Sequence, residues 1–151
     1  VEELLQQTGP TLVNARDVNG DTALIVAVAR RDDTWTAFLL SNGADPNLAN
    51  RKGDTPLTTA ARVGYLQGAE WLLTKRARVD EANKMGETPL ILAVQARQAP
   101  LVKFLLSKGA DPDRTDSAAG YSARDYARRD NRNPELLRLI ETAKKPATAA
   151  R

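Results

Sequence analysis

The side chains of this sequence that could do acid–base chemistry are carboxylates, because the chain contains neither histidine nor cysteine. That composition excludes thiol nucleophiles, disulfides, histidine bases, His/Cys zinc sites and haem ligation through either residue. Asp32 and Asp33 are adjacent and could serve as an acid and a base. No phosphate-binding GxGxxG or GxxxxGK[ST] loop accompanies them. An enzyme is therefore the least supported function, and we expect none.

A second acidic group, Asp111, Asp113 and Asp116, has part of the spacing of a calcium-binding loop. The glycine and the bidentate glutamate that complete such a loop are missing. We interpret the three residues as part of a turn, and we expect no metal and no other cofactor.

Basic residues could bind an acidic partner. The 151 residues include 22 Lys and Arg against 19 Asp and Glu, a net charge of +3. Counted by thirds, the net charge runs from −4 in residues 1–50 to +3 in 51–100 and +4 in 101–151. Such a gradient can orient a molecule toward a charged partner, although it also favours solubility alone.

The length of the chain and its short apolar runs predict a single soluble domain. A chain of about 150 residues can bury roughly 70% of its unfolded surface without a disulfide or a metal. The longest apolar run, around Leu24–Ala29, is far shorter than the about 20 residues that a membrane helix needs. The start of the chain has no signal-peptide pattern, so we expect no membrane insertion.

The elements that must position these side chains repeat along the chain. Copies of one motif stand at a constant spacing as Gly20–Leu24, Gly53–Leu57 and Gly86–Leu90, and a weaker copy, Gly120–Ala123, follows after one inserted residue. A second motif in phase, Leu39–Asn47, returns two periods later as Leu105–Asp113. The copy between them, Leu72–Asp80, has lost the glycine. A fixed period of this length indicates a solenoid of stacked units.

Each unit is expected to hold two short helices. The hydroxyls of Thr22, Thr55, Thr88 and Ser122 are placed to cap the first helix, and an apolar stripe at i, i+3 and i+4 follows each of them. A second helix begins near Asp33, Pro100 or Asn133–Pro134, and Gly43 or Gly109 ends it in a left-handed conformation. Helices this short persist only when stacked on neighbours.

The motif Asp-x-x-Gly-x-Thr-Pro-Leu, the alanine pair and Leu-Leu-x-x-Gly-Ala-Asp resemble ankyrin repeats over about residues 17–143. The resemblance implies an all-α solenoid of helix-turn-helix units with β-turn or hairpin fingers. The expected repeats are 17–49, 50–82, 83–115 and 116–143, after a half repeat at 1–16 that contains a helix at Glu2–Gln7. Residues 144–151 are expected to be a disordered tail.

Several positions depart from the ankyrin pattern. Its Thr-Pro-Leu-His histidine is replaced by Ile25, Thr58, Ile91 and Asp125, so we expect contacts between repeats to depend more on packing. The Gly expected between the two helices of a repeat is kept only as Gly64, with Arg31, Arg97 and Asn131 elsewhere.

Other departures bear on stability. Gly68 lies where Ile is usual and is expected to leave a void that Trp71 fills, making residues 66–80 the least protected from hydrogen exchange. Trp35, Phe38, Trp71 and Phe104 are expected in the core. Arg124 replaces a buried Leu, which suits the water-facing end of a solenoid.

Ankyrin domains usually bind partners on the concave surface formed by finger tips and first helices. The residues that map to this surface here and are expected to bind a partner are Asn19, Arg30, Arg51, Lys52, Arg62, Lys84, Met85, Gln95, Tyr121 and Arg129. Their charge favours a protein with an acidic patch, bound by a noncatalytic module. Nucleic-acid binding through the same residues is the alternative, although the net charge is modest and stacking aromatics are lacking. Single Lys and Arg residues at finger tips could also simply be solvated.

The segments Ser122–Asn133 and Ala27–Trp35 resemble small ankyrin proteins of Gram-negative bacteria, many of which are exported. This resemblance slightly favours the periplasm over the cytoplasm. We expect a monomer, because the ends look capped and no exposed apolar patch is evident.

Overall fold

The computed structural model describes residues 10–143, which form nine helices and no β-strand. A short helix α2 (Pro10–Val13) precedes four helix pairs. These pairs are α3 (Ala23–Ala29) with α4 (Asp33–Ser41), α5 (Pro56–Val63) with α6 (Leu66–Thr74), α7 (Pro89–Gln95) with α8 (Ala99–Ser107), and α9 (Ala123–Arg129) with α10 (Pro134–Thr142). The helix expected at Glu2–Gln7 and the tail expected at 144–151 lie outside the described residues.

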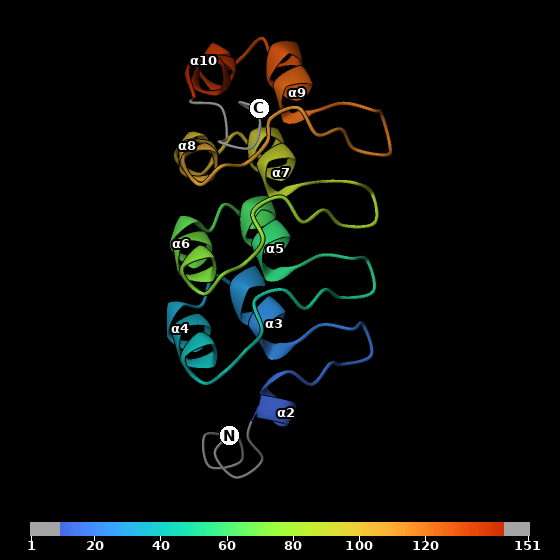
Figure 1. The fold of residues 1–151 in the computed structure, drawn as a ribbon, viewed down its shortest axis with the longest axis vertical. Helices are drawn as coiled ribbons and strands as arrows, with labels where there is room; N and C mark the ends of the chain where they lie inside the picture. Colours follow the sequence, from blue (N-terminus) through green and yellow to red (C-terminus); the bar gives the residue numbers. More distant parts are fainter. Residues whose placement is uncertain (1–9, 144–151) are drawn as a thin grey trace.

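The helix pairs stack along one axis in two layers. Figure 1 shows α3, α5, α7 and α9 in one layer and α4, α6, α8 and α10 in the other, with the connecting loops projecting from the first-helix side. Helix α5 contacts both α3 and α7, as expected of a stack in which each unit meets only its neighbours. The predicted all-α solenoid is confirmed.

The first helices begin where the hydroxyl residues predict. Thr22, Thr55 and Thr88 accept hydrogen bonds from the backbone N–H three residues on, at 3.1–3.2 Å. Ser122 does the same for α9, at 3.1 Å from the N–H of Asp125. Each bond satisfies one of the free N–H groups of a helix start, so the four predicted caps are confirmed.

The apolar stripe of the first helices forms the core. Leu24, Leu57 and Leu90 are at most 1% exposed, and the alanines at 60, 61 and 93 are completely buried. Burying one leucine contributes roughly 2–3 kcal/mol, and the small alanines let neighbouring helices approach closely. The stack is therefore held by the same residue positions in successive units.

The second-helix aromatics do not all lie in this core. Phe38, Trp71 and Phe104 are half-buried against it, but Trp35 is 39% exposed, so its predicted burial is wrong. The equivalent residue in α8, Leu101, is only 2% exposed because a preceding helix pair covers it. In the described residues no helix pair precedes α3 and α4, which leaves Trp35 uncovered.

The predicted void at Gly68 is also wrong. A Cβ atom at this position would lie 2.4 Å from Cδ2 of Tyr65, so the tyrosine ring already fills the space above the glycine. The Tyr65 hydroxyl donates a hydrogen bond to the Asp33 carboxylate of the preceding pair, which fixes the ring. Trp71 lies instead on the outer face, beside Leu40 and Ser41 of α4.

Left-handed backbone recurs at two equivalent positions of the helix pairs, and arginine occupies some of them. Gly43 and Gly109 have φ values of 92° and 90° after their second helices, as predicted, and Arg76 adopts 70° at the same place. Between the two helices of a pair, Arg31 and Arg97 have φ values of 53° and 57°. A side chain in this conformation costs backbone energy, so each of these arginines carries a strain that glycine would remove.

The C-terminal end of the stack is polar, as expected. Arg124 and Arg128 occupy the positions at which α7 has the buried Leu90 and Val94. The Arg124 Nε donates to the Asp113 carboxylate at 2.8 Å. Charged groups therefore cover the face that would otherwise pack on a further unit.

Candidate partner-binding surface

Loops between helix pairs form a row of fingers on one side of the molecule (Figure 1). Within each finger a side-chain oxygen of Asp17, Asn50 or Asn83 accepts the backbone N–H two residues on, at 2.8–3.0 Å. These bonds close a tight turn and hold the residues at its tip. The sequence motif Asp/Asn-x-x-Gly therefore determines the shape of each finger locally.

Backbone hydrogen bonds join each finger to the next. The N–H of Arg51 donates to the carbonyl of Asn19 at 3.3 Å, and the N–H of Lys84 donates to the carbonyl of Lys52 at 3.0 Å. The N–H of Ser117 similarly donates to the carbonyl of Met85 at 2.8 Å. The structure thus brings five of the predicted binding residues, which are far apart in sequence, into one continuous row.

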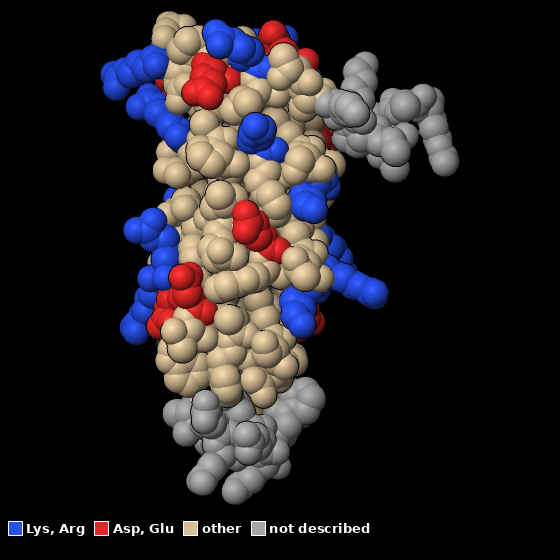
Figure 2. Space-filling model, turned by 90° about the vertical axis from the view of Figure 1, so that its left-hand side faces the viewer, with Lys and Arg blue, Asp and Glu red and all other residues tan. Residues whose placement is uncertain are grey.

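This row is basic and exposed. Arg51, Lys52 and Lys84 are exposed, and none of them has a carboxylate oxygen within 4.0 Å in the described part of the chain. Met85 lies beside them and is 54% exposed. By contrast, Figure 2 shows that the opposite face, formed by the second helices, has a mainly uncharged centre.

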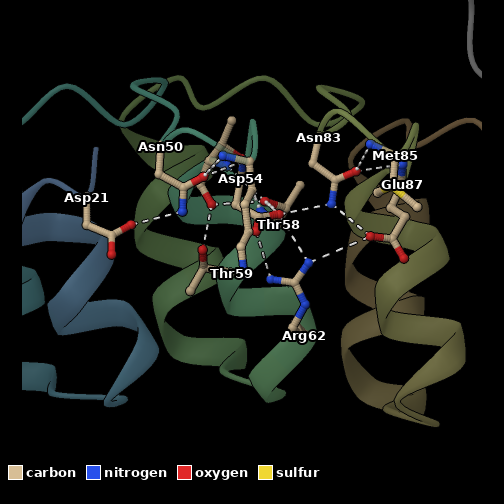
Figure 3. Close-up of polar contacts among 11 residues, drawn as sticks. Asp21, Asn50, Asp54, Thr58, Thr59, Arg62, Asn83, Met85 and Glu87 are labelled. Atoms are coloured by element: carbon tan, nitrogen blue, oxygen red, sulfur yellow. Dashed lines mark hydrogen bonds and ion pairs between the residues drawn. The ribbon is translucent and has the colours of Figure 1, made fainter. Parts of the chain in front are cut away.

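Below the finger tips, side-chain amides link consecutive fingers. Asn50 donates to the Asp21 carboxylate at 2.9 Å, and Asn83 donates to Asp54 at 2.9 Å, as Figure 3 shows. Polar bonds thus link two successive pairs of fingers although the histidine of the ankyrin pattern is missing, while a greater dependence of the contacts between repeats on packing stays a prediction. The return of Asn50 as Asn83, one repeat period later, was the sequence signal for this arrangement.

Arg62 is held within this network. Two of its nitrogens lie 3.1 Å from the two Asp54 oxygens, and its Nη2 is 3.7 Å from Glu87 of the next finger (Figure 3). Burial raises the pKa of the Asp54 carboxyl, but hydrogen bonds from Arg62, Asn83 and Thr58, together with the positive charge of Arg62, outweigh burial and leave that pKa below its usual value. Arg62 therefore connects two helix pairs, a role that its place on the concave surface did not reveal.

Three of the four remaining predicted residues lie at the ends of first helices, and the fourth, Tyr121, precedes α9. Arg30 directly follows α3, whereas Gln95 and Arg129 are the last residues of α7 and α9, and all three are exposed. Half-buried Tyr121 accepts a hydrogen bond from Arg129 at 2.8 Å, and the Arg129 guanidinium lies 4.7 Å from the centre of its ring. These residues extend the surface from the fingers along the first helices.

The carboxylates considered above for acid–base chemistry and for calcium binding accept hydrogen bonds from within the fold. Asp32 caps α4, and Asp33 accepts the Tyr65 hydroxyl. Asp111 accepts the N–H of Asp113 at 2.9 Å, which supports its interpretation as part of a turn. These contacts account for the carboxylates without assigning them a reaction.

Comparisons with known proteins agree with the architecture. A family model described as ankyrin repeats in three copies matches residues 29–116, more than half of the chain. The regulatory protein SWI6 of Kluyveromyces lactis is 46% identical over 50 residues, which are 33% of this chain and 6% of that protein, so only a small part of the relative is spanned. None of the helices in residues 10–143 is long and apolar enough to cross a membrane. The chain belongs to the ankyrin repeat family, whose members are typically nonenzymatic modules for protein–protein interaction.

Proposed function

We propose that this chain is a noncatalytic module that binds a protein partner with an acidic patch through its finger row and first-helix ends. The observation that carries the proposal is the exposed row of Arg51, Lys52 and Lys84, which have no described carboxylate within 4.0 Å. Positive groups arranged in this way attract and orient a negatively charged surface.

The hydrogen-bonded fingers support binding without large rearrangement. Backbone bonds of 2.8–3.3 Å join successive finger tips, so little chain entropy needs to be lost on association. Exposed Met85 beside the basic side chains supplies an apolar contact at the centre of the row. The variable residues at the finger tips would then determine which partner is bound.

The test is affinity capture from a lysate of the source organism with two charge-reversed variants. The first carries Arg51→Glu, Lys52→Glu and Lys84→Glu. The matched control carries Lys75→Glu, Lys103→Glu and Lys108→Glu, which reverse the same number of charges at exposed positions within or directly after α6 and α8. Arg62 is left unchanged because it connects two helix pairs.

We expect a partner protein that the wild type and the control retain and the finger variant loses. Circular dichroism must show that both variants keep the helical fold. Equal retention by all three proteins would contradict the proposal, since binding would then lie elsewhere. Recovery that nuclease abolishes, with steep salt dependence on DNA or RNA, would favour the nucleic-acid alternative instead.

A further inference from the structure

A depression of about 440 Å³ lies between the C-terminal ends of α7 and α9, away from the finger tips. Its lining includes three arginines from two consecutive helix pairs. Besides Val94 and Tyr126, the residues that line it are Gln95, Arg97, Arg129, Asp130, Asn131 and Arg132. We call these six residues the arginine pocket.

One arginine of the pocket is already neutralised. Arg97 donates from Nε to Asp130 at 2.7 Å and from Nη2 to the second oxygen of the same carboxylate at 3.4 Å. The hydrogen bond from Arg97 is the main cause that lowers the pKa of Asp130, so the carboxylate stays ionised and the pair carries no net charge. This pair fastens α7 to α9 and forms one wall of the pocket.

The other two arginines leave an excess positive charge. In the described residues no carboxylate oxygen lies within 4.0 Å of the guanidinium groups of Arg129 or Arg132, and both residues are exposed. The carbonyl ends of α7 and α9 each carry about half a negative charge. Two full positive charges exceed these partial charges, so the pocket favours an anion.

Arg129 is also held in position. It donates to the Tyr121 hydroxyl and lies over the Tyr121 ring, which packs edge-on against Tyr126 at 5.5 Å between centroids. The Tyr126 hydroxyl in turn donates to the buried Asp116. This chain of contacts fixes one nitrogen of Arg129 while its other N–H groups stay able to donate. The exposed side-chain amides of Gln95 and Asn131 add further donors.

We propose that the arginine pocket receives carboxylate side chains of the acidic protein partner, and that it anchors this partner to the concave surface. The inference rests on the proposed function and names the chemistry of one contact within it. Guanidinium groups match carboxylates in planar, paired hydrogen bonds, which finger-tip lysines cannot reproduce. Two adjacent acidic residues of the partner would balance Arg129 and Arg132.

The experiment uses an acetylated and amidated hexaglutamate peptide as the probe. The peptide is titrated into the isotope-labelled full chain, and two-dimensional NMR follows the arginine Nε–H signals and the side-chain amides of Gln95 and Asn131. The variants are Arg129→Gln and Arg132→Gln. The matched control is Arg138→Gln, which removes the same charge from α10 outside the pocket. A variant with Lys84→Gln reports on the finger row.

We expect the signals of Gln95, Asn131 and the pocket arginines to shift, and each pocket variant to bind hexaglutamate about tenfold more weakly, the size of one lost charge-assisted hydrogen bond. Arg138→Gln should change the affinity less than about threefold, as general screening of a surface charge predicts. Arg129→Gln alters a held side chain, so the Arg132→Gln variant is an independent test.

The outcomes separate this inference from the proposed function. Unchanged affinity in Arg132→Gln and Arg129→Gln with a loss in Lys84→Gln would overturn the pocket while the finger surface stands. Loss in the pocket variants alone would support the pocket and contradict the finger row. Shifts with inorganic phosphate but none with hexaglutamate would overturn the carboxylate assignment. An absence of shifts at both places would overturn both.

Discussion

Replacement of Gly68 by alanine tests whether packing or helix propensity dominates in α6. Helix propensity alone predicts that the substitution increases the free energy of unfolding, because glycine inside a helix costs about 1 kcal/mol relative to alanine. The structure predicts a loss, because the new Cβ would lie 2.4 Å from Cδ2 and 2.5 Å from Cε2 of Tyr65. Ordinary contacts of a Cβ atom begin near 3.4 Å, so the ring would have to move by about 1 Å.

The Tyr65 ring cannot move freely. It is only 6% exposed, and its hydroxyl is bonded to Asp33 of the preceding helix pair. Overpacking of this kind typically costs about 1–3 kcal/mol, which after the propensity gain leaves a net loss of about 0–2 kcal/mol. For a chain of this size, that is a decrease in Tm of up to about 4–8 °C.

The assay is urea denaturation followed by circular dichroism, together with a double-mutant cycle. The neighbouring pair α7 and α8 has Gln98 and Leu101 at the positions of Tyr65 and Gly68, so Tyr65→Gln should make room for the alanine. We expect Gly68→Ala to be destabilising in the wild type and stabilising in the Tyr65→Gln background. The difference between the exposed control variants Gln67→Ala and Gln67→Gly measures propensity alone in the same helix, because both lack the Gln67 hydrogen bond to Glu70.

Equal effects of Gly68→Ala in both backgrounds would refute this reasoning. In that case the Tyr65 ring would relax at no cost, and Gly68 would border an unfilled space after all. A stability gain of about 1 kcal/mol in the wild type would show the same by itself. Hydrogen exchange over residues 66–80 then becomes the direct measure of how firmly α6 is held.

Three other perturbations test the fold and its polar network. Arg76→Gly should stabilise the chain by about 1 kcal/mol in urea denaturation, because it relieves a φ of 70°, whereas Arg78→Gly should not stabilise it. Asn83→Ala should cost about 2–4 kcal/mol by the same assay, because a buried amide that donates to Asp54 and Glu87 and accepts two N–H groups is lost. Asp54→Asn should be destabilising at pH 7 but progressively less so as the pH falls below about 4. Thermal unfolding of both proteins at a series of pH values measures this difference. The folded pKa of Asp54 is lowered, so its contribution is present above the unfolded pKa and is lost as the pH falls through the folded pKa. A difference between wild type and Asp54→Asn that is constant with pH would contradict this linkage.

Local signals explain why so much of the fold could be predicted. The hydroxyl of Thr55, which precedes a proline, caps its helix by accepting the N–H only three residues on. The apolar stripe that follows repeats with the period of the helix itself. The position of Arg124 at the water-facing end likewise followed from its departure from the leucine of other units. Such features need no knowledge of what lies across the stack.

The binding surface was predictable only in part. The positions of Arg51, Lys52 and Lys84 at finger tips followed from the repeat phase, and their alignment in one row follows from the backbone bonds between fingers. The repeat pattern also places Arg62 on the concave surface, but its environment differs from that of the finger tips, because the carboxylates of Asp54 and Glu87 contact it from two fingers. A repeat pattern gives a residue's place within its unit and leaves its partners in the next unit undetermined.

The period, the helix starts, the core positions of the first helices and the family could all be predicted from the residues, because each depends on spacing within one unit. Three other features emerge only in the folded stack: the Tyr65 ring covers Gly68, Arg62 joins two helix pairs, and Arg97, Arg129 and Arg132 meet in one pocket. These outcomes depend on side chains that come from different units and on which of several possible partners each side chain reaches. That choice is made by packing between units, where small differences in distance separate a contact from a clash.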